Sequence, residues 1–470
     1  MKIYLVNHTF DYACTHIAKL FVERPQVQVV GDDFTAPAIE HIVSRVLFFA
    51  GKRVVLTTVQ IADKTHYSAE ETVTSDDVGE LKRAVIRGIF DCLAFVTGYR
   101  PEWGILVGVR PTKLVSSMLN GGLDESAIAE RLSKQYYLKP AKIALLLEIC
   151  RVEQSLLESN HENGFSIYVG IPFCPSRCVY CSFISQVSAR GSADVARYVD
   201  ALIAELYSKR HDFANRPVDA LYIGGGTPAI LNGEQINRLF AALCDCYQLD
   251  KVREITFEAG RPELIDEALL SALRDNGVGR ICVNPQTMHD ETLRRIGRQH
   301  SVADIERALN LVKNYDFDAV NVDIIAGLAG ETIDMFRQTV RRILECRPEN
   351  ITVHCLAIKR ASKLAEDSRR DNMTAADVVR RQLGDAARLL GAQGYRPYYM
   401  YRQKNMLANL ENVGYALNGK ASFYNVAIIE ERQSIVAFGA GATSKIVQRD
   451  GSIKRYHNPK DIKTYISRHS

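Results

Sequence analysis

Long hydrophobic runs are missing from this sequence, and their absence excludes a class of protein. No stretch of the chain approaches the roughly 18 consecutive apolar residues that a membrane-spanning helix requires. The first residues, MKIYLVNHTFDYAC, contain one lysine and a short mixed run, which is not the composition of a signal peptide. We therefore expect a cytoplasmic protein with no membrane partner.

A strong excess of charge of one sign is missing as well. Lysine and arginine together number 59 and aspartate and glutamate 55, so the formal net charge is +4. Dedicated nucleic-acid-binding domains concentrate basic residues far more densely, and we therefore expect no nucleic-acid partner. A small anionic substrate is compatible with this balance.

Cysteine, by contrast, is not scarce. The chain has 11 cysteines, and in a reducing compartment they are not expected to form a disulfide framework. Three of them, Cys174, Cys178 and Cys181, lie close together in the run IPFCPSRCVYCSF. The other cysteines are spread along the chain and are expected to be small buried hydrophobic side chains.

The length of 470 residues predicts two or three domains. Residues 1–160 are expected to form an N-terminal α+β domain, because the strand-like runs KIYLV and RVVLTTVQIA are followed by segments of helical periodicity, the last of them AKIALLLEICRVEQSLLESN. The polar stretch SNHENG is the expected linker. Residues 161–360 and 361–470 are expected to be a barrel domain and a C-terminal extension.

In the predicted barrel domain, short β-like runs alternate with helical ones. The six expected strands are SIYVGI, DALYIGG, REITFEA, GRICVN, AVNVDIIAGL and NITVHCL. Strand–helix repeats with right-handed crossovers form a parallel sheet with helices outside. Six such units predict an α/β fold built as an open six-unit (β/α) barrel, with its active residues at the C-terminal ends of the strands.

The C-terminal extension has a different pattern. The run ADVVRRQLGDAARLLGAQG predicts a helix, and RPYYMYRQKN is aromatic and basic. The later runs SFYNVAII, SIVAFGAGATSKI and SIKRYH predict short strands and turns.

The spacing of the clustered cysteines, C-x3-C-x2-C, allows one loop to hold a small inorganic group. A structural zinc site is usually closed by four ligands, and the nearest histidines, His161 and His211, lie outside the loop. Thiolates also suit iron–sulfur clusters, and three cysteines would leave one iron of a 4Fe–4S cluster open. Three packed structural cysteines are the remaining alternative.

The run YVGIPFCPSRCVYCSF resembles the cluster-binding loop of the radical S-adenosylmethionine (SAM) superfamily. The runs YIGGGTP, TFEAGRPE, VNPQTM, LRRIGRQH and NVDIIAGLAGET follow in the order found in its oxygen-independent coproporphyrinogen III oxidase branch. The long N-terminal domain and the run YYMYRQKN…LENVGYA are most similar to the HemZ-type coproporphyrinogen dehydrogenases. The resemblance is strong in the middle of the chain and extends over most of it.

This resemblance implies a 4Fe–4S cluster on the three cysteines, with SAM bound at the open iron and cleaved by one electron to a 5′-deoxyadenosyl radical. Tyr168, Glu258 and Arg298 are the implied catalytic residues, and Arg298 would pair with the SAM carboxylate. The residues implied in SAM binding are Tyr180, Gly224, Gly225, Gly226, Thr227, Glu258, Gln286, Arg298 and Asp323. From the residues alone, a simple turn at the glycines, a surface role for Glu258 and a core position for Tyr168 stay open.

The resemblance also implies a tetrapyrrole substrate. The reaction would convert coproporphyrinogen III to protoporphyrinogen IX, with electrons from a donor such as flavodoxin or ferredoxin. The candidate cations for the substrate carboxylates, which are otherwise solvated surface residues, are Lys359, Arg360, Arg396, Arg402 and Lys404. The segment GAGATSK (439–445) is either a backbone contact to SAM or substrate or a tight turn between strands.

One departure from the branch keeps a binding function open. Phe183 stands where the bacterial oxidases carry a fourth cysteine, and the haem-chaperone relatives have an aromatic residue there. A haem-binding chaperone is therefore an alternative expectation. A radical SAM enzyme that acts on haem, for example by methyl transfer and ring opening, is a further one.

Overall fold

The computed structural model describes residues 1–49, 52–72, 77–108, 110–158, 161, 163–213, 216–357, 376–402 and 406–469. The chain divides into two compact units, Met1–Leu147 and Glu148–Ser470. The boundary lies inside helix α5 (Pro140–Glu158). The domain limits at residues 160 and 360 stay predictions.

The first unit is built on a five-stranded sheet with the order β2-β1-β3-β4-β5. The runs KIYLV and RVVLTTVQIA form β1 (Lys2–Val6) and β4 (Lys52–Ile61), as predicted. The sequence analysis missed β2 (Gln26–Val30), β3 (His41–Phe49) and β5 (Lys64–Thr72). The helices of this unit are α1 (Asp11–Ala18), α2 (Val78–Thr97), α3 (Pro111–Asn120) and α4 (Glu125–Tyr136).

The second unit contains the six predicted parallel strands, which are neighbours in chain order. They are β6 (Phe165–Ile171), β9 (Val218–Gly225), β10 (Glu254–Gly260), β11 (Arg280–Gln286), β12 (Ala319–Ala326) and β13 (Asn350–Cys355). Apolar residues in these strands are buried, as expected for a sheet that is covered on its faces. The open (β/α) barrel is thereby confirmed.

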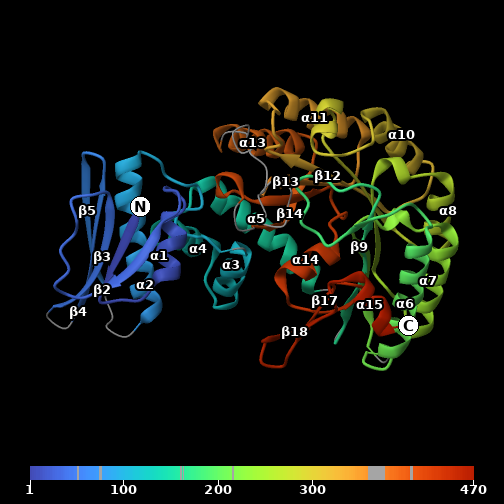
Figure 1. The fold of residues 1–470 in the computed structure, drawn as a ribbon, viewed down its shortest axis with the longest axis horizontal. Helices are drawn as coiled ribbons and strands as arrows, with labels where there is room; N and C mark the ends of the chain where they lie inside the picture. The colour runs from blue at the N-terminus through green and yellow to red at the C-terminus, as the bar shows by residue number, and fades with distance from the viewer. Residues whose placement is uncertain are drawn as a thin grey trace. The chain divides into compact units, whose positions relative to one another are not determined.

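Helices follow the strands of the barrel and lie along the outer rim of the sheet (Figure 1). They are α6 (Ala193–Lys209), α7 (Gly233–Cys246), α8 (Glu267–Asp275), α9 (Asp290–Arg295), α10 (Val302–Val312) and α11 (Ile333–Cys346). Local sequence fixes several of their starts. The side chains of Ser301 and Asp304, for example, form a capping box at the first turn of α10.

The C-terminal extension continues the barrel sheet at both of its edges. Strands β14 (Arg396–Tyr401) and β15 (Asn412–Ala416) are added beside β13, and β16 (Ser434–Phe438), β17 (Thr443–Val447) and β18 (Ile453–His457) beside β6. The result is an eleven-stranded sheet. Helices α13 (Ala376–Ala392), α14 (Phe423–Glu430) and α15 (Ile462–His469) complete the extension.

One predicted strand of the extension is wrong, because SFYNVAII forms helix α14. Ser422 caps this helix by accepting a hydrogen bond from the Asn425 N–H. The Glu254 carboxylate accepts the N–H groups of Phe423 and Tyr424. Glu254, which is far away in the sequence, therefore accepts hydrogen bonds from the free N–H groups of the first turn. No local sequence pattern could reveal this contact.

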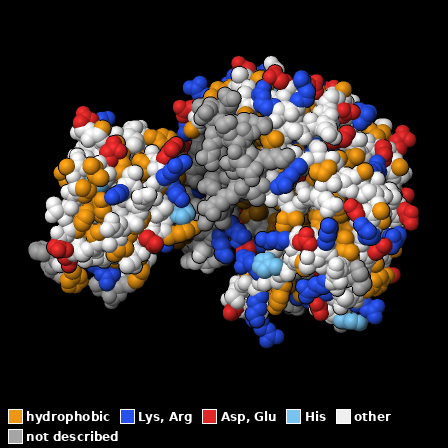
Figure 2. All heavy atoms as spheres, viewed as in Figure 1, with side chains coloured by type: hydrophobic (Ala, Val, Ile, Leu, Met, Phe, Trp, Pro, Cys, Tyr) orange, Lys and Arg blue, Asp and Glu red, His pale blue; other side chains and the backbone are white. Residues whose placement is uncertain are grey.

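The surface of the second unit agrees with the small net charge. Acidic and basic side chains are interspersed over the visible face of its outer helices (Figure 2). Among the described residues, no helix combines the length and the apolar character needed to cross a membrane.

Candidate functional site

A cavity of about 510 Å³ opens within the second unit, at the C-terminal ends of the barrel strands. Gly225, Gly260 and Gln286, which end β9, β10 and β11, all line it. The predicted site residues among its lining are Tyr168, Cys174, Cys178, Tyr180, Cys181, Gly225, Gly226, Thr227, Glu258, Gln286, Arg298 and Asp323. These residues come from five successive β/α units, and Thr352, His354 and Cys355 of β13 add the sixth, as the strand-end rule leads one to expect.

The cysteine loop follows β6 and contains the short strand β7 (Phe173–Cys174). Cys174 and Cys178 are buried, whereas Cys181 is half-exposed. The Thr227 hydroxyl donates to Cys174 Sγ at 3.4 Å, and Arg261 Nη2 donates to Cys178 Sγ at 3.3 Å. Both buried sulfurs thus have a hydrogen-bond donor beside them, as ligand sulfurs of metal sites commonly do.

The donor set of this loop fits an iron–sulfur cluster. Among the described residues, no three His, Cys, Asp or Glu side chains lie close enough together to ligate a single metal ion. The three candidate ligands of the loop are all cysteines, and thiolates are the ligands that suit iron–sulfur clusters. Hydrogen bonds to the ligand sulfurs, such as those from Thr227 and Arg261, are a means by which proteins tune such clusters.

The glycines after β9 allow a close approach between this strand end and the cysteine loop. Gly225 has φ +111°, a conformation that residues with a side chain rarely adopt. A Cβ on Gly226 would lie 2.5 Å from the Phe173 carbonyl oxygen, and one on Gly224 would lie 2.7 Å from Glu258 Oε2. Packing within the protein thus explains all three glycines, and Gly224 is not among the residues that line the cavity.

A group of acidic and polar side chains lies across β10, β11 and β12. Asn284 Nδ2 donates to Glu258 Oε1 at 3.3 Å. Burial and the nearby Asp323 carboxylate raise the pKa of Glu258 to about 7, against hydrogen bonds from the Gly225 backbone, Tyr222 and Asn284. His354 Nε2 lies 3.3 Å from Asp323 Oδ2. Glu258 can therefore change its charge near neutral pH, in contact with the cavity.

A second polar group surrounds Arg298. Its guanidinium donates to the Asn284 carbonyl and also interacts with the Tyr180 hydroxyl. Burial lowers the pKa of Arg298, but the interaction with Tyr180 opposes this, and the pKa is raised overall. Gln286 is buried with φ +71°, an uncommon conformation for a residue other than glycine. Within the described structure, no partner hydrogen-bonds to Arg298 Nε, Gln286 Oε1 or Asn284 Oδ1. Buried polar groups are normally satisfied, so these atoms indicate a polar ligand.

Several residues of the cavity were missed by sequence reasoning. Arg261 directly follows β10 in the run TFEAGRPE, so the strand-end rule could have found it. Cys282 was expected to be a buried hydrophobic residue, and it is buried but also lines the cavity. A set of tyrosines forms much of one wall, and its members besides Tyr168 are Tyr222, Tyr399, Tyr401 and Tyr424.

Other predicted residues are not brought to the cavity. Arg396 is exposed and lies 3.9 Å from Glu148, and Arg402 is buried and donates to the Asn409 carbonyl. Neither lines the cavity. Lys359, Arg360 and Lys404 lie outside the described residues.

The segment GAGATSK contains the tight turn between β16 and β17. Gly439 N–H donates to Glu205 Oε2 at 2.8 Å, and Ala440 N–H donates to the Tyr198 hydroxyl at 2.9 Å. A Cβ on Gly439 would lie 2.4 Å from the Gly170 carbonyl oxygen. The turn therefore accounts for these glycines, and no residue of the segment lines the cavity.

Comparison with known proteins places these observations in a family context. Residues 168–343 match the model of the radical SAM superfamily. Over 467 residues the chain is 34% identical to the oxygen-independent coproporphyrinogen-III oxidase-like protein HemZ of Bacillus subtilis, which covers 96% of this chain and 92% of that protein.

Two further relatives match over shorter segments. The heme chaperone HemW of Lactococcus lactis is 31% identical over 41% of this chain and 49% of its own. The oxygen-independent coproporphyrinogen III oxidase of Escherichia coli is 33% identical over 41% of this chain and 42% of its own. The solved structure of coproporphyrinogen III oxidase (HemN) from Escherichia coli matches with a TM-score of 0.54 and 25% identity, over 68% of this chain and 71% of that one.

Proposed function

This chain belongs to the radical SAM superfamily, in its HemN- and HemZ-like branch, and from that membership we propose that it is an enzyme that oxidatively decarboxylates coproporphyrinogen III to protoporphyrinogen IX without oxygen. The observation that carries the proposal is the single cavity that holds both the three-cysteine loop and a wall of tyrosines. Similarity to HemZ over nearly the whole chain supports it. We also propose that the protein acts in the cytoplasm.

The residues present fit the two cofactors of this superfamily. Cys174, Cys178 and Cys181 would hold a 4Fe–4S cluster, with one iron left open for SAM. When bound, the cluster and SAM supply a one-electron cleavage of a carbon–sulfur bond, which generates a radical able to abstract hydrogen. A donor such as flavodoxin or ferredoxin would supply the electron.

The polar residues of the cavity would bind and orient SAM. An ionised Glu258 carboxylate would accept hydrogen bonds from the SAM ammonium group, and the Arg298 guanidinium would donate to the SAM carboxylate. The Gln286 amide oxygen and Asp323 would accept hydrogen bonds from ribose hydroxyls or adenine. Tyr180 would lie near the adenine, and the Gly225–Thr227 backbone would approach the amino group.

The tyrosine wall would hold the tetrapyrrole and exclude water from the reacting carbon. Each of two propionate groups would give a hydrogen atom from the carbon β to its carboxylate to the SAM-derived radical. It would then lose carbon dioxide and pass one electron to a one-electron acceptor, which leaves a vinyl group. The arginines among the described lining residues are Arg177, Arg261 and Arg298. Arg177 is exposed and would donate to a substrate carboxylate.

A second candidate function is a haem chaperone. The similarity to HemW favours it, and so does Phe183, which is 63% exposed and lines the cavity where an apolar macrocycle could contact it. A radical SAM enzyme that acts on haem would use the same cavity. These functions differ from the first in the tetrapyrrole that binds and in its fate.

The deciding experiment is an anaerobic turnover assay. The cluster is reconstituted, SAM, a reductant and coproporphyrinogen III are added, and mass spectrometry follows 5′-deoxyadenosine and the tetrapyrrole. We expect the loss of two carboxyl groups coupled to 5′-deoxyadenosine formation in the wild type and in the control Cys246→Ala, whose cysteine lies outside the cavity, but not in Cys178→Ala.

An intact cluster and cleaved SAM with unchanged coproporphyrinogen would contradict the proposed reaction. In that case a haem titration separates the alternatives. Stoichiometric, stable haem binding without turnover indicates the chaperone, and chemical change of the haem indicates an enzyme that acts on it.

A further inference from the structure

Helix α14 carries the chain from one edge of the six barrel strands to the other. The strand before it, β15, pairs with β13, and the strand after it, β16, pairs with β6. Between these edges α14 packs against β9 and β14. The helix therefore crosses the barrel between the two edges of the six strands.

The two faces of α14 have different surroundings. Phe423, Val426 and Ala427 are buried in a core cluster with residues of α5, β9 and β14. The other face lines the cavity through Tyr424, Asn425, Ile428 and Ile429, of which Tyr424 also belongs to that cluster and Ile428 and Ile429 pack against it. A helix that is apolar nearly all round, as FYNVAIIE is, is expected to be enclosed on both faces.

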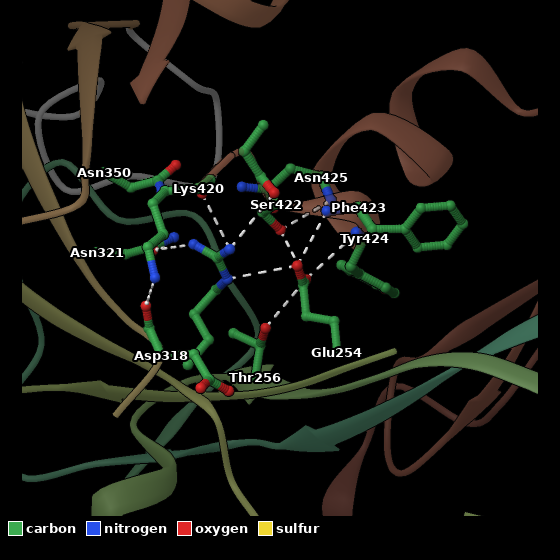
Figure 3. Close-up of polar contacts among 12 residues, drawn as sticks. Glu254, Thr256, Asp318, Asn321, Asn350, Lys420, Ser422, Phe423, Tyr424 and Asn425 are labelled. Atoms are coloured by element: carbon green, nitrogen blue, oxygen red, sulfur yellow. Dashed lines mark hydrogen bonds and ion pairs between the residues drawn. The ribbon is translucent and has the colours of Figure 1, made fainter. Parts of the chain in front are cut away.

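Glu254 and Arg280, the first residues of β10 and β11, anchor the start of α14. Figure 3 shows Ser422, Phe423 and Tyr424 converging on the Glu254 carboxylate, which accepts the Ser422 hydroxyl at 2.7 Å. Arg280 Nε forms an ion pair with Glu254 Oε2 at 3.3 Å, and Arg280 Nη2 donates to the Lys420 carbonyl at 3.0 Å. The barrel thus fixes the position of the helix at its first turn.

Tyr424 is the cavity residue that this anchor positions most directly. Its ring stacks on Tyr222 with centroids 4.5 Å apart, and Tyr222 in turn stacks on Tyr168 at 6.2 Å. The Tyr424 hydroxyl is buried and has no hydrogen-bond partner among the described residues. Burial raises the pKa of Tyr424 well above its usual value, with Tyr168 and Glu258 adding to the effect, so the hydroxyl stays a hydrogen-bond donor.

We propose that α14 is the substrate-facing wall of the cavity. In this arrangement the Tyr424 hydroxyl donates a hydrogen bond to the tetrapyrrole, Ile428 and Ile429 contact its apolar face, and Glu254 and Arg280 are positioning residues that hold the helix. The proposal deepens the proposed function and rests on a tetrapyrrole being the ligand of the cavity. It assigns substrate recognition to the C-terminal extension and SAM recognition to the strand ends of the barrel.

The test compares two variants that each lose one buried, unpartnered phenol hydroxyl. Tyr424→Phe removes the hydroxyl in the cavity, and the control Tyr247→Phe removes one that lies outside it. The full chain with reconstituted cluster is titrated with coproporphyrin III and, separately, with haem, both followed by porphyrin absorbance, and with SAM by calorimetry. We expect Tyr424→Phe to weaken tetrapyrrole binding about tenfold, as the loss of one hydrogen bond predicts, with the SAM Kd unchanged.

A second pair of variants tests the anchor. Glu254→Gln should raise the Kd for the tetrapyrrole and leave the Kd for SAM unchanged. The control Glu205→Gln weakens a different anchor of the C-terminal extension, at Gly439 and Tyr465, and should change neither. A merely structural role for Glu254 would alter both affinities together.

The outcomes separate this proposal from the proposed function. If only haem binds, and Tyr424→Phe weakens haem binding, the assignment of coproporphyrinogen fails while the role of α14 stands. If the wild type converts coproporphyrinogen and Tyr424→Phe binds coproporphyrin III as tightly as the wild type does, the role of α14 is refuted. Binding of neither tetrapyrrole to the wild type refutes both.

Discussion

The raised pKa of Glu258 predicts how the free energy of unfolding depends on pH. Burial and the Asp323 carboxylate raise its pKa in the folded protein to about 7, from a usual value of 4.5. The folded protein therefore binds this proton more tightly than the unfolded chain does, and the free energy of unfolding falls as the pH rises from about 4.5 to 7. At about 1.4 kcal/mol per pH unit, the loss amounts to at most about 3 kcal/mol, because Glu258 borders the cavity and water there solvates part of the charge.

The assay compares the wild type with Glu258→Gln, which keeps the shape of the side chain and cannot ionise. The titratable groups that face Glu258 are Asp323 on β12, Cys282 on β11, Tyr222 on β9, Tyr168 on β6 and Tyr424 on α14. Because these and all other titrating groups are shared by the two proteins, the difference between the pH slopes isolates Glu258. Cluster-free protein is used, so that no ligand changes the charge of the cavity.

The measurement is thermal unfolding at pH 5 and pH 8. Far-UV circular dichroism follows both compact units, whereas fluorescence of Trp103, the single tryptophan, follows the first unit. We expect the barrel transition of the wild type to lose more stability between the two pH values than that of Glu258→Gln, with the Trp103 transition unaffected. Equal losses in the two proteins would refute the burial and charge argument.

Three further predictions concern the cysteine loop and its supports. Cys181→Ala should abolish retention of iron and sulfide after reconstitution, whereas Cys246→Ala, outside the cavity, should retain both; equal retention by the two variants would speak against a role for the loop in binding a cluster. Gly226→Ala should destabilise the protein by about 1–3 kcal/mol in thermal unfolding, because the new Cβ would overlap the Phe173 carbonyl oxygen. Gly233→Ala, where a Cβ would meet no atom closer than 3.8 Å, should be neutral or stabilising. Equal effects of the two substitutions would show that the contact between Gly226 and Phe173 is unimportant for stability. Arg261→Leu should bind iron but release it to a chelator about tenfold faster, because it loses a charged hydrogen bond to a ligand sulfur; an unchanged release rate would contradict this.

The barrel could be predicted because its signals are local. Each strand is a short apolar run, and each helix has its own periodicity and often its own cap, as Ser301 and Asp304 show for α10. The three clustered cysteines are a local signal of the same kind. Their meeting with Glu258, Gln286 and Arg298 followed from the fold, because parallel strands bring their C-terminal ends to one edge.

The features that were missed depend on distant residues. Helix α14 was predicted as a strand because its apolar run has no polar face, and its first turn is satisfied by Glu254 on β10. Tyr222 and Tyr424 are ordinary tyrosines in the sequence and become a stacked pair only when α14 lies inside the barrel. The edge strand β5 of the first unit, KTHYSAEET, carries little apolar pattern, and most of its side chains with described burial are exposed.

The crossing of the open barrel by α14 has a consequence for the order in which the molecule is made. Ser166, at the start of the barrel, hydrogen-bonds to Gln433, which lies 267 residues further along the chain. During synthesis the cysteine loop therefore leaves the ribosome long before the helix that will form a wall of its cavity. Contacts of such long sequence separation form late in folding. The cavity therefore gains its α14 wall only after the C-terminal extension has been translated, whereas Thr227 and Arg261, which contact Cys174 and Cys178, are made much earlier.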